Sequence, residues 1–298
     1  MNREKWIIKD LLDITSDYLK SKDITSPRLN AEILLAHQLN TDRIRLYLNY
    51  DQPLSENDIG SYRSLIKRLL KKEPVQYITG TQEFRSLDFI VDPNVLIPRP
   101  ETEVLVEQAL DLCTKDNVYE NEGPSILDMG TGSGAIAVSI AIELRRVKVW
   151  AGDISKGALD IAKLNARRHS TEDRIQLIQG DLFEPFRLNL NNFDIIISNP
   201  PYVTSKEYDS LPPEVRDYEP RIALDGREDG LFFIKRIINE ASHYLKPGGW
   251  LLIEMDPRQT ETALQMTGDN PSYGYKKIIK DYSHKDRVLI ARKAEVLK

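Results

Sequence analysis

A glycine-rich stretch, Asp128-Met-Gly-Thr-Gly-Ser-Gly-Ala135, has the residue types of a loop that binds a nucleotide-like ligand. Gly130, Gly132 and Gly134 carry no Cβ atom, so the backbone can turn sharply and approach a ligand closely. The loop follows a predicted strand and opens a predicted helix, which is where doubly wound folds bind nucleotides. Gly130, Gly132 and Ala135 also satisfy the dinucleotide pattern G-x-G-x-x-G/A. The loop therefore fits both NAD and S-adenosylmethionine.

Two aspartates stand at the ends of the next predicted strands. Asp153 lies 23 positions after Gly130, where an acid can accept hydrogen bonds from the ribose hydroxyls of either cofactor. Its alternative role is a helix cap before Ser155. Asp181 follows the third predicted strand and could meet an adenine amino group, with Leu182 against the ring, or be an ordinary loop acid. Both acids indicate a nucleoside without identifying it.

The segment Asn199-Pro-Pro-Tyr202 ends a fourth buried strand and suits the handling of a planar nitrogen. Amide and amino nitrogens are weak nucleophiles, so an enzyme gains by fixing the NH2 group with acceptors and aiming it at the methyl donor. The Asn199 side-chain oxygen and the Pro200 carbonyl can accept its two hydrogens. Pro201 stiffens the loop, and Tyr202 can stack on the flat group. Neither proline has an N–H that would compete for the acceptors.

These motifs require a scaffold of parallel strands, and the second half of the chain predicts one. Uniformly apolar runs separated by roughly 20 residues or more are typical of a parallel sheet with helices on both faces. The segments 276–280 and 287–292 are too close together for a crossover helix, so we expect an antiparallel pair. The predicted strands are Ile126–Met129, Val147–Trp150, Ile175–Ile178, Ile195–Ile197 and Trp250–Ile253.

The first 73 residues have helical apolar spacing, as at Ile59, Tyr62, Ile66 and Leu69, and predict a small helical N-terminal domain. Two helix starts can be predicted in this domain. Ser26 is expected to cap a helix that begins at Pro27, and Ser55 with Asp58 resembles a capping box. Residues 74–100 predict a linker with short strands or a hairpin. Residues 101–298 then form the doubly wound α/β domain.

Composition narrows the class of protein. The chain has 298 residues, 41% hydrophobic and 29% charged, with a formal net charge of -5. It has no apolar run near the roughly 18 residues that span a bilayer, and acids interrupt residues 1–20, so we expect a cytoplasmic protein without a membrane partner. One cysteine and four scattered histidines offer no metal site. A basic stretch within residues 61–72 is either a solvated helix face or a contact to RNA or an acidic partner.

Taken together, these motifs resemble class I S-adenosylmethionine-dependent methyltransferases that modify planar nitrogens, and most closely the HemK/PrmC-type protein glutamine-N5 methyltransferases. The likeness extends over nearly the whole chain. The residues that carry it are Leu29–Leu35, Pro74–Gly80, Leu96-Ile-Pro-Arg-Pro-Glu-Thr-Glu103, the glycine loop, Gly180–Phe183, Ser198–Tyr202, Tyr218–Leu224, Asp229–Leu231 and Lys246–Trp250.

The resemblance implies a seven-stranded, mostly parallel sheet with an antiparallel C-terminal hairpin, and methyl transfer to the glutamine of the Gly-Gly-Gln motif in class 1 peptide chain release factors. S-adenosylmethionine would be the donor and S-adenosylhomocysteine the product. The N-terminal domain would contact the release factor, with no stable nucleic-acid partner. The cofactor residues implied are Gly130, Thr131, Gly132, Ser133, Gly134, Asp153, Asp181, Leu182 and Asn199. The substrate residues implied are Asn199, Pro200, Pro201, Tyr202, Arg99 and Glu101, with Asn199, Pro200 and Tyr202 catalytic.

Some positions depart from the family pattern. The family has glycine at the positions of Arg227 and Asp256, and Ala-Gly-Arg where this chain has Ser283-His284-Lys285. These sites lie outside the cofactor and amide motifs, so they bear on loop geometry more than on activity. The stretch from Arg99 to Glu101 has two interpretations: a lining of the substrate channel, or a proline-marked helix start whose acids complement the helix dipole.

Three other classes compete with this interpretation. A DNA or RNA amino methyltransferase handles the same planar nitrogen, but a DNA enzyme needs a basic recognition region to hold the duplex and extrude the base. A nicotinamide-dependent oxidoreductase fits the glycine loop and Asp153 but would need an acid or base near the nicotinamide. A noncatalytic scaffold would have lost the cofactor residues, which are intact here.

Overall fold

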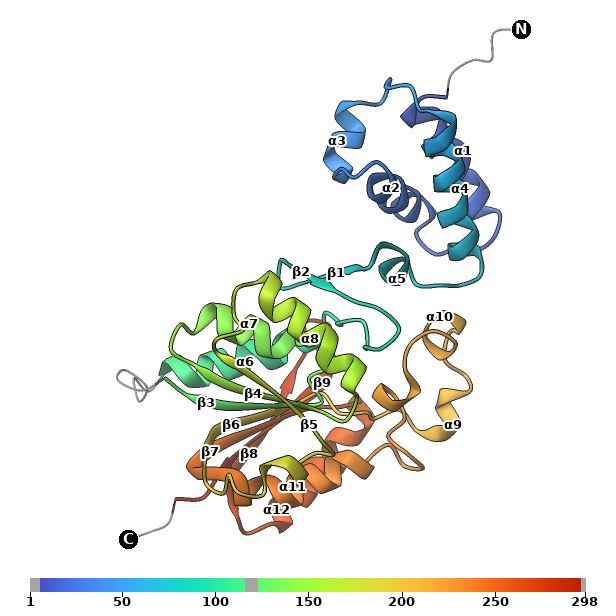
Figure 1. The fold of residues 1–298 in the computed structure, drawn as a ribbon. Coiled ribbons are helices and arrows are strands. Elements are labelled where there is room, and N and C mark those ends of the chain that lie inside the picture. Colours follow the sequence, from blue (N-terminus) through green and yellow to red (C-terminus); the bar gives the residue numbers. More distant parts are fainter. Residues whose placement is uncertain (1–5, 116–122, 296–298) are drawn as a thin grey trace, which may run out of the picture. The chain divides into compact units, whose positions relative to one another are not determined.

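The computed structural model describes residues 6–115 and 123–295, and the chain forms two compact units (Figure 1). The first comprises Met1–Gly80 together with Pro213–Tyr218, and the second comprises Thr81–Pro212 and Glu219–Lys298. The segment 213–218 belongs to the first unit although it is far away in sequence. The hydroxyl of Tyr218 there donates a hydrogen bond to the Lys71 carbonyl at 2.8 Å.

The first unit is helical, as predicted. Its core consists of leucines and isoleucines from several helices, and the buried Tyr62 donates its hydroxyl hydrogen to the Ala31 carbonyl at 3.0 Å. The capping box is confirmed, because Ser55 Oγ accepts from the Asp58 N–H and the Asp58 carboxylate accepts from the Ser55 N–H. The helices are α1 Ile8–Lys20, α2 Pro27–Gln38, α3 Arg43–Leu48, α4 Glu56–Leu70, α5 Val75–Thr79 and α10 Pro213–Arg216.

The predicted cap at Ser26 is wrong, although helix α2 does begin at Pro27. Ser26 has φ 49° and ψ 55°, in the left-handed region, and its side chain makes no cap hydrogen bond. A capping residue normally has extended dihedrals, which direct its oxygen toward the free N–H groups of the first turn. The proline marked the helix start, and the backbone conformation removed the capping role of the serine.

The second unit contains the predicted doubly wound sheet, in the order β5-β4-β3-β6-β7-β9-β8. Neighbouring strands from β5 to β7 are parallel, and β9 is antiparallel to both β7 and β8, as predicted for the C-terminal pair. A separate antiparallel hairpin precedes the sheet. The strands are β1 Thr81–Phe84, β2 Leu87–Ile90, β3 Ser125–Met129, β4 Lys148–Asp153, β5 Ile175–Gln179, β6 Phe193–Ser198, β7 Leu245–Glu254, β8 Tyr273–Lys280 and β9 Asp286–Lys293.

Helices cover both faces of this sheet (Figure 1). Side chains of α6, α7 and α8 share one hydrophobic cluster with the strands, and those of α11 and α12 share the other. Within residues 6–115 and 123–295, no helix is both long and apolar enough to cross a membrane. The helices of this unit are α6 Thr102–Lys115, α7 Ala135–Glu143, α8 Lys156–Arg168, α9 Ser205–Tyr208, α11 Phe232–Tyr244, α12 Thr260–Asp269 and the short 3-10 helices Glu184–Phe186, Arg221–Ala223 and Pro257–Gln259.

The central strands β3 and β6 bring the two chemical motifs together. Met129 pairs with Ser198, and the Ser198 hydroxyl donates to the Met129 carbonyl at 2.7 Å. The order in which strands are added to the sheet reverses here, because β4 is added on one side of β3 and β6 on the other, although all of these strands are parallel. Such a switch point is where open α/β sheets bind ligands. The glycine loop and Asn199 thus begin side by side.

The three departures from the family pattern differ in backbone conformation. Arg227 and His284 have φ 72° and 60°, in the left-handed region that glycine adopts without cost. Asp256 has φ -64°, and its side chain accepts from the Arg258 N–H, so it fits its position without strain. Two of the three departures therefore place a bulky side chain where the backbone favours glycine.

We expect His284→Gly to raise the free energy of unfolding by about 0.5–1 kcal/mol, since relief of left-handed strain outweighs the entropy that glycine adds to the unfolded chain. His284 is exposed in the turn between β8 and β9, so little packing is lost. Chemical denaturation measures the change. His284→Ala is the control, because alanine keeps the strain. Equal stability of the glycine and alanine variants would contradict the prediction.

Candidate active site

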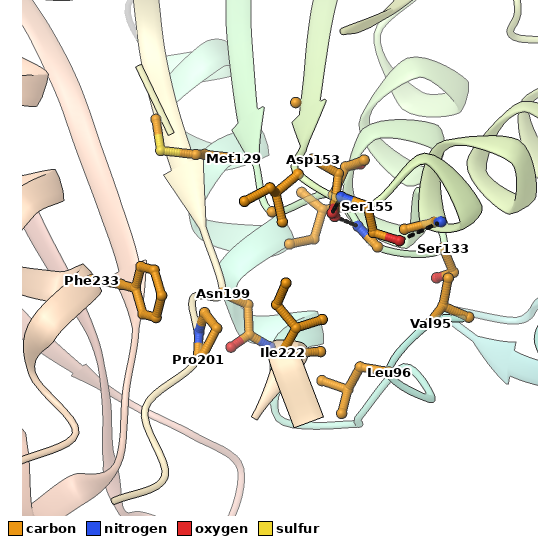
Figure 2. A pocket seen from close by; sticks show the side chains of 18 of the residues that line it. Val95, Leu96, Met129, Ser133, Asp153, Ser155, Asn199, Pro201, Ile222 and Phe233 are labelled. Atoms are coloured by element: carbon orange, nitrogen blue, oxygen red, sulfur yellow. Dashed lines mark hydrogen bonds between the residues drawn. The ribbon is translucent and has the colours of Figure 1, made fainter. Parts of the chain in front are cut away.

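A pocket of about 380 Å³ lies at the carboxyl edge of the sheet (Figure 2). Its walls come from the loops after β3, β4, β5 and β6, from residues 94–99, and from helix α11, all within the second unit. Apolar side chains such as Val95, Ile222 and Phe233 face the same space as Asp153 and Asn199. A mostly apolar cavity with a few convergent polar groups is the usual form of a small-molecule site.

The glycine loop forms one wall. Gly130, Gly132 and Gly134 have φ of 73°, 55° and 80°, so all three require the left-handed conformation that makes the turn. Four of the five predicted loop residues, from Gly130 to Ser133, line the pocket. Gly134 does not; it precedes helix α7, and a Cβ atom there would be 3.2 Å from Ala162. Gly134 therefore serves helix packing.

Asp128 anchors this loop from beneath. It is fully buried, and its Oδ2 accepts from the Thr131 hydroxyl at 2.6 Å and from the Ala137 N–H at 3.2 Å. Burial raises the pKa of Asp128 to about 7, although these two hydrogen bonds favour the charged form. The sequence placed Asp128 in the motif but gave it no role.

The free energy of unfolding should depend on pH because Asp128 is buried. Because the folded-state pKa lies above the unfolded value of about 3.9, the contribution of Asp128 is fully present below about pH 4 and is lost as the pH rises through about 7. We expect wild type to lose stability relative to Asp128→Asn between these pH values. Chemical denaturation at pH 5 and pH 8 measures it, with the exposed Asp160→Asn as the control for charge. A difference that is the same at both pH values would contradict the prediction.

Asp153 ties the end of β4 to the glycine loop. Its Oδ2 accepts from the Gly132 N–H at 2.9 Å and its Oδ1 from the Ser155 N–H at 2.8 Å. Burial raises its pKa, and these backbone bonds work in the opposite direction. Helix α8 is capped instead by Ser155, whose hydroxyl accepts from the Ala158 N–H at 3.2 Å. Asp153 lines the pocket and keeps lone pairs for further donors.

Asp181 and Leu182 line the pocket beyond β5. The Asp181 carboxylate accepts from the Arg236 guanidinium at 2.9 Å, and Arg236 lines the pocket as well. Arg236 comes from helix α11, 55 positions later in the chain. Sequence reasoning missed Arg236, because no local pattern connects helix α11 to the loop after β5.

The residues from Asn199 to Tyr202 divide between the pocket and the core. Asn199 and Pro201 line the pocket, whereas Pro200 is buried. The Asn199 side-chain NH2 donates to Thr102 Oγ1 at 3.0 Å, which leaves its oxygen available as an acceptor. Tyr202 is not among the lining residues; its ring packs against the core and its hydroxyl donates to Glu254 at 3.4 Å. Burial raises the pKa of the Tyr202 hydroxyl.

Of the predicted channel residues, the structure brings Arg99 to the pocket and not Glu101. The Arg99 guanidinium pairs with the buried carboxylate of Glu219, whose second oxygen accepts from the Ile97 N–H at 3.1 Å. This pair holds residues 97–99 in place along the rim. Glu101 immediately precedes helix α6, which begins at Thr102. Sequence reasoning missed Glu219, although it lies in a stretch quoted for the family resemblance.

Comparison with known proteins agrees with this fold. Residues 120–292 match a family model described as a methyltransferase domain, and residues 10–80 match one described as the PrmC N-terminal domain. The crystal structure of a methyltransferase from Pyrococcus furiosus superposes with a TM-score of 0.50 at 19% identity, covering 79% of this chain and 98% of that one. At this identity, the likeness shows the fold alone. The chain is a class I methyltransferase.

Named relatives show to which family of methyltransferases the chain belongs. A release factor glutamine methyltransferase of Geobacter sulfurreducens is 46% identical over 263 residues, covering 88% of this chain and 89% of the relative. One from Rhodopirellula baltica is 42% identical over 98% of both chains. This chain belongs to the release factor glutamine methyltransferase family.

Proposed function

We propose that this protein transfers a methyl group from S-adenosylmethionine to the side-chain amide nitrogen of the glutamine in the Gly-Gly-Gln motif of class 1 peptide chain release factors. The observation that carries the proposal is the position of Asn199. It lies in one pocket with the glycine loop, and its NH2 group is bound to Thr102. The remaining Asn199 oxygen is an acceptor for a substrate NH2 group. The names of the relatives favour a glutamine amide as that group.

The pocket fits a nucleoside with a charged, flexible tail. The loop from Gly130 to Ser133 would hold the amino-acid end, Asp153 the ribose hydroxyls, and Asp181 with Leu182 the adenine. The left-handed glycines allow backbone N–H groups to approach the ligand, and Asp153 keeps acceptor capacity. When bound, the cofactor supplies an electrophilic methyl group.

The protein's own contribution is positioning. The Asn199 side-chain oxygen and the Pro200 carbonyl accept the two hydrogens of the glutamine NH2 group and hold its nitrogen toward the pocket. Apolar side chains, including Phe233 and Ile222, line this space. The nitrogen–carbon bond would form as the donor's sulfur–carbon bond breaks, and the amide proton that is lost would pass by way of the aligned acceptors to solvent water. Acceptors aligned with the NH2 group favour that loss without a strong base.

The helical unit offers a surface for the protein substrate. Arg63, Lys67 and Lys71 are exposed on or just after helix α4, and Arg68 is partly neutralised by Glu73. We propose that these basic residues bind an acidic patch on the release factor. Because release factors act in translation, we also propose that the enzyme works in the cytoplasm.

Mass spectrometry of the substrate tests the proposal. A recombinant class 1 release factor is incubated with the protein and S-adenosylmethionine, with RNA and DNA in parallel reactions, followed by intact-mass analysis and peptide mapping. We expect one added methyl group on the Gly-Gly-Gln glutamine and none on nucleic acid. An unmodified release factor beside methylated RNA or DNA would overturn the assignment and favour a nucleic-acid methyltransferase.

A further inference from the structure

Helix α11 holds an arginine at the wall of the pocket. Phe232, Arg236 and Glu240 are four positions apart, so they form one row along this helix. Phe232 and Arg236 line the pocket. The Arg236 guanidinium carbon lies 5.8 Å from the centre of the Phe232 ring, and the Arg236 Nε lies 3.7 Å from a Glu240 carboxylate oxygen. Arg236 is therefore supported from both sides by its own helix.

The Arg236 guanidinium holds one oxygen of the Asp181 carboxylate. The Arg236 Nη1 donates to Asp181 Oδ2 at 2.9 Å. Within residues 6–115 and 123–295, the other oxygen, Oδ1, makes no hydrogen bond. Asp181 itself lines the pocket. One carboxylate oxygen is thus fixed by helix α11, and the second is available to accept from a donor in the pocket.

This ion pair affects the orientation of Asp181 more than the stability of the fold. The side chains of Asp181 and Arg236 are 37% and 31% exposed, and water screens the attraction between charges that it reaches this well. A carboxylate without a partner rotates about its Cβ–Cγ bond and is solvated by water. A carboxylate held by a guanidinium presents its second oxygen in a fixed direction.

The order of the strands places Asp181 where the base of a nucleoside cofactor would lie. Strands β6, β3, β4 and β5 are neighbours in that order, and Asn199, the glycine loop, Asp153 and Asp181 stand at or just after their carboxyl ends. Neighbouring strands are about 4.8 Å apart, so a ligand with its reactive group at Asn199 and its ribose at Asp153 extends toward Asp181 with its base. An adenine presents a 6-amino donor there. A hypoxanthine presents a 6-oxo acceptor instead.

We infer that Arg236 is a positioning residue that orients Asp181 for selective binding of the adenine amino group of the cofactor. This inference rests on the proposed function, because it takes S-adenosylmethionine as the cofactor. With Oδ2 held by Arg236, the Asp181 Oδ1 accepts from a 6-amino group and repels a 6-oxo group. A carboxylate released from Arg236 can rotate to accept from the N1–H group of hypoxanthine, so the preference for adenine falls.

Binding of the reaction product and of one analogue tests the role of Arg236 without catalysis. S-adenosylhomocysteine carries adenine, and S-inosylhomocysteine is the same molecule with hypoxanthine. By calorimetric titration, we expect wild type to bind the adenine compound about thirtyfold more tightly, a difference typical of one charge-assisted hydrogen bond. Arg236→Met should weaken binding of the adenine compound about tenfold and keep that of the hypoxanthine compound within about twofold, so that the ratio of the two affinities falls to about three.

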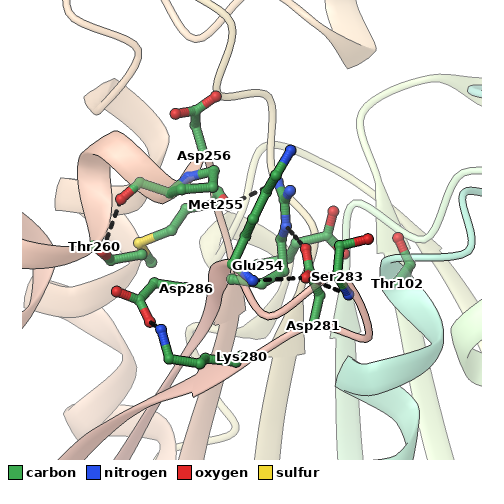
Figure 3. Close-up of polar contacts among 12 residues, drawn as sticks. Thr102, Glu254, Met255, Asp256, Thr260, Lys280, Asp281, Ser283 and Asp286 are labelled. Carbon is green, nitrogen blue, oxygen red and sulfur yellow. Dashed lines mark hydrogen bonds and ion pairs between the residues drawn. The ribbon is translucent and has the colours of Figure 1, made fainter.

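Two variants control for the loss of a cation and its ion pair. Lys235→Met changes the neighbouring residue on α11, which pairs with Asp229 and is not among the residues that line the pocket. Lys280→Met breaks an exposed pair with Asp286, 2.6 Å long, in the hairpin of β8 and β9 (Figure 3). Both variants should keep the wild-type ratio of affinities. Thermal melting checks that each variant is folded.

A second background shows whether Arg236 acts through Asp181. In Asp181→Ala protein, Arg236→Met should change the affinity for S-adenosylhomocysteine by less than about twofold, because the carboxylate that Arg236 orients is gone. A tenfold loss in this background as well, or a wild-type ratio in Arg236→Met, would overturn the inference and leave the proposed function standing. Wild-type protein that binds neither compound would instead overturn the cofactor of the proposed function, and the inference with it.

Discussion

Asn199→Ala should lower methyl transfer to the release factor about 10²- to 10³-fold while leaving the affinity for S-adenosylmethionine within about twofold of wild type. The size of the loss is that of removing one preorganised polar contact at a reacting centre. Cofactor binding survives because the glycine loop and Asp153 are held by Asp128 and by backbone N–H groups that do not involve Asn199. Single-turnover assays by mass spectrometry and calorimetric titration measure the two quantities.

Asn192→Ala is the matched control, since Asn192 lies just before strand β6 and Asn199 just after it. It should transfer methyl groups at the wild-type rate. Full activity in Asn199→Ala would mean that the Pro200 carbonyl alone holds the substrate amide.

Asp153→Ala should affect cofactor binding more than methyl transfer. We expect it to weaken S-adenosylmethionine binding about a hundredfold. Charge-assisted hydrogen bonds contribute roughly 1.5–3 kcal/mol each, and this carboxylate would accept from the cofactor's ribose. Its loss also releases the Gly132 and Ser155 N–H groups, which loosens the loop. At saturating cofactor we expect kcat to recover most of its wild-type value. Calorimetric titration measures the affinity.

Asp153→Asn keeps the shape and one acceptor and should have intermediate affinity. Asp160→Ala, exposed on helix α8, controls for loss of an acid from the same region. If Asp153→Ala and Asn199→Ala weakened cofactor binding equally, the division of roles between the two residues would be wrong. Thermal melting of each variant identifies any change that comes from unfolding.

The fold could be predicted largely from the sequence. Strands buried on both faces are uniformly apolar, and the short separation of β8 from β9 excludes a crossover, so the mixed sheet follows from local pattern. Ser26 was misassigned because a residue type indicates capping ability but not the φ and ψ that the chain adopts. That Pro213–Tyr218 belongs to the same unit as the N-terminal helices could not be predicted from the sequence, because no local pattern encodes a contact between segments so far apart in the chain.

For the candidate site, the sequence by itself determined the loop of left-handed glycines and the Asn-Pro-Pro-Tyr segment, because both depend on residues adjacent in the chain. Only the tertiary structure decided that Asn199 faces the pocket while the Tyr202 hydroxyl turns to Glu254. It also supplied Thr102, which is 97 positions from Asn199. Such partners are chosen by strand register and helix packing, which depend on the whole fold and leave no mark on neighbouring residues.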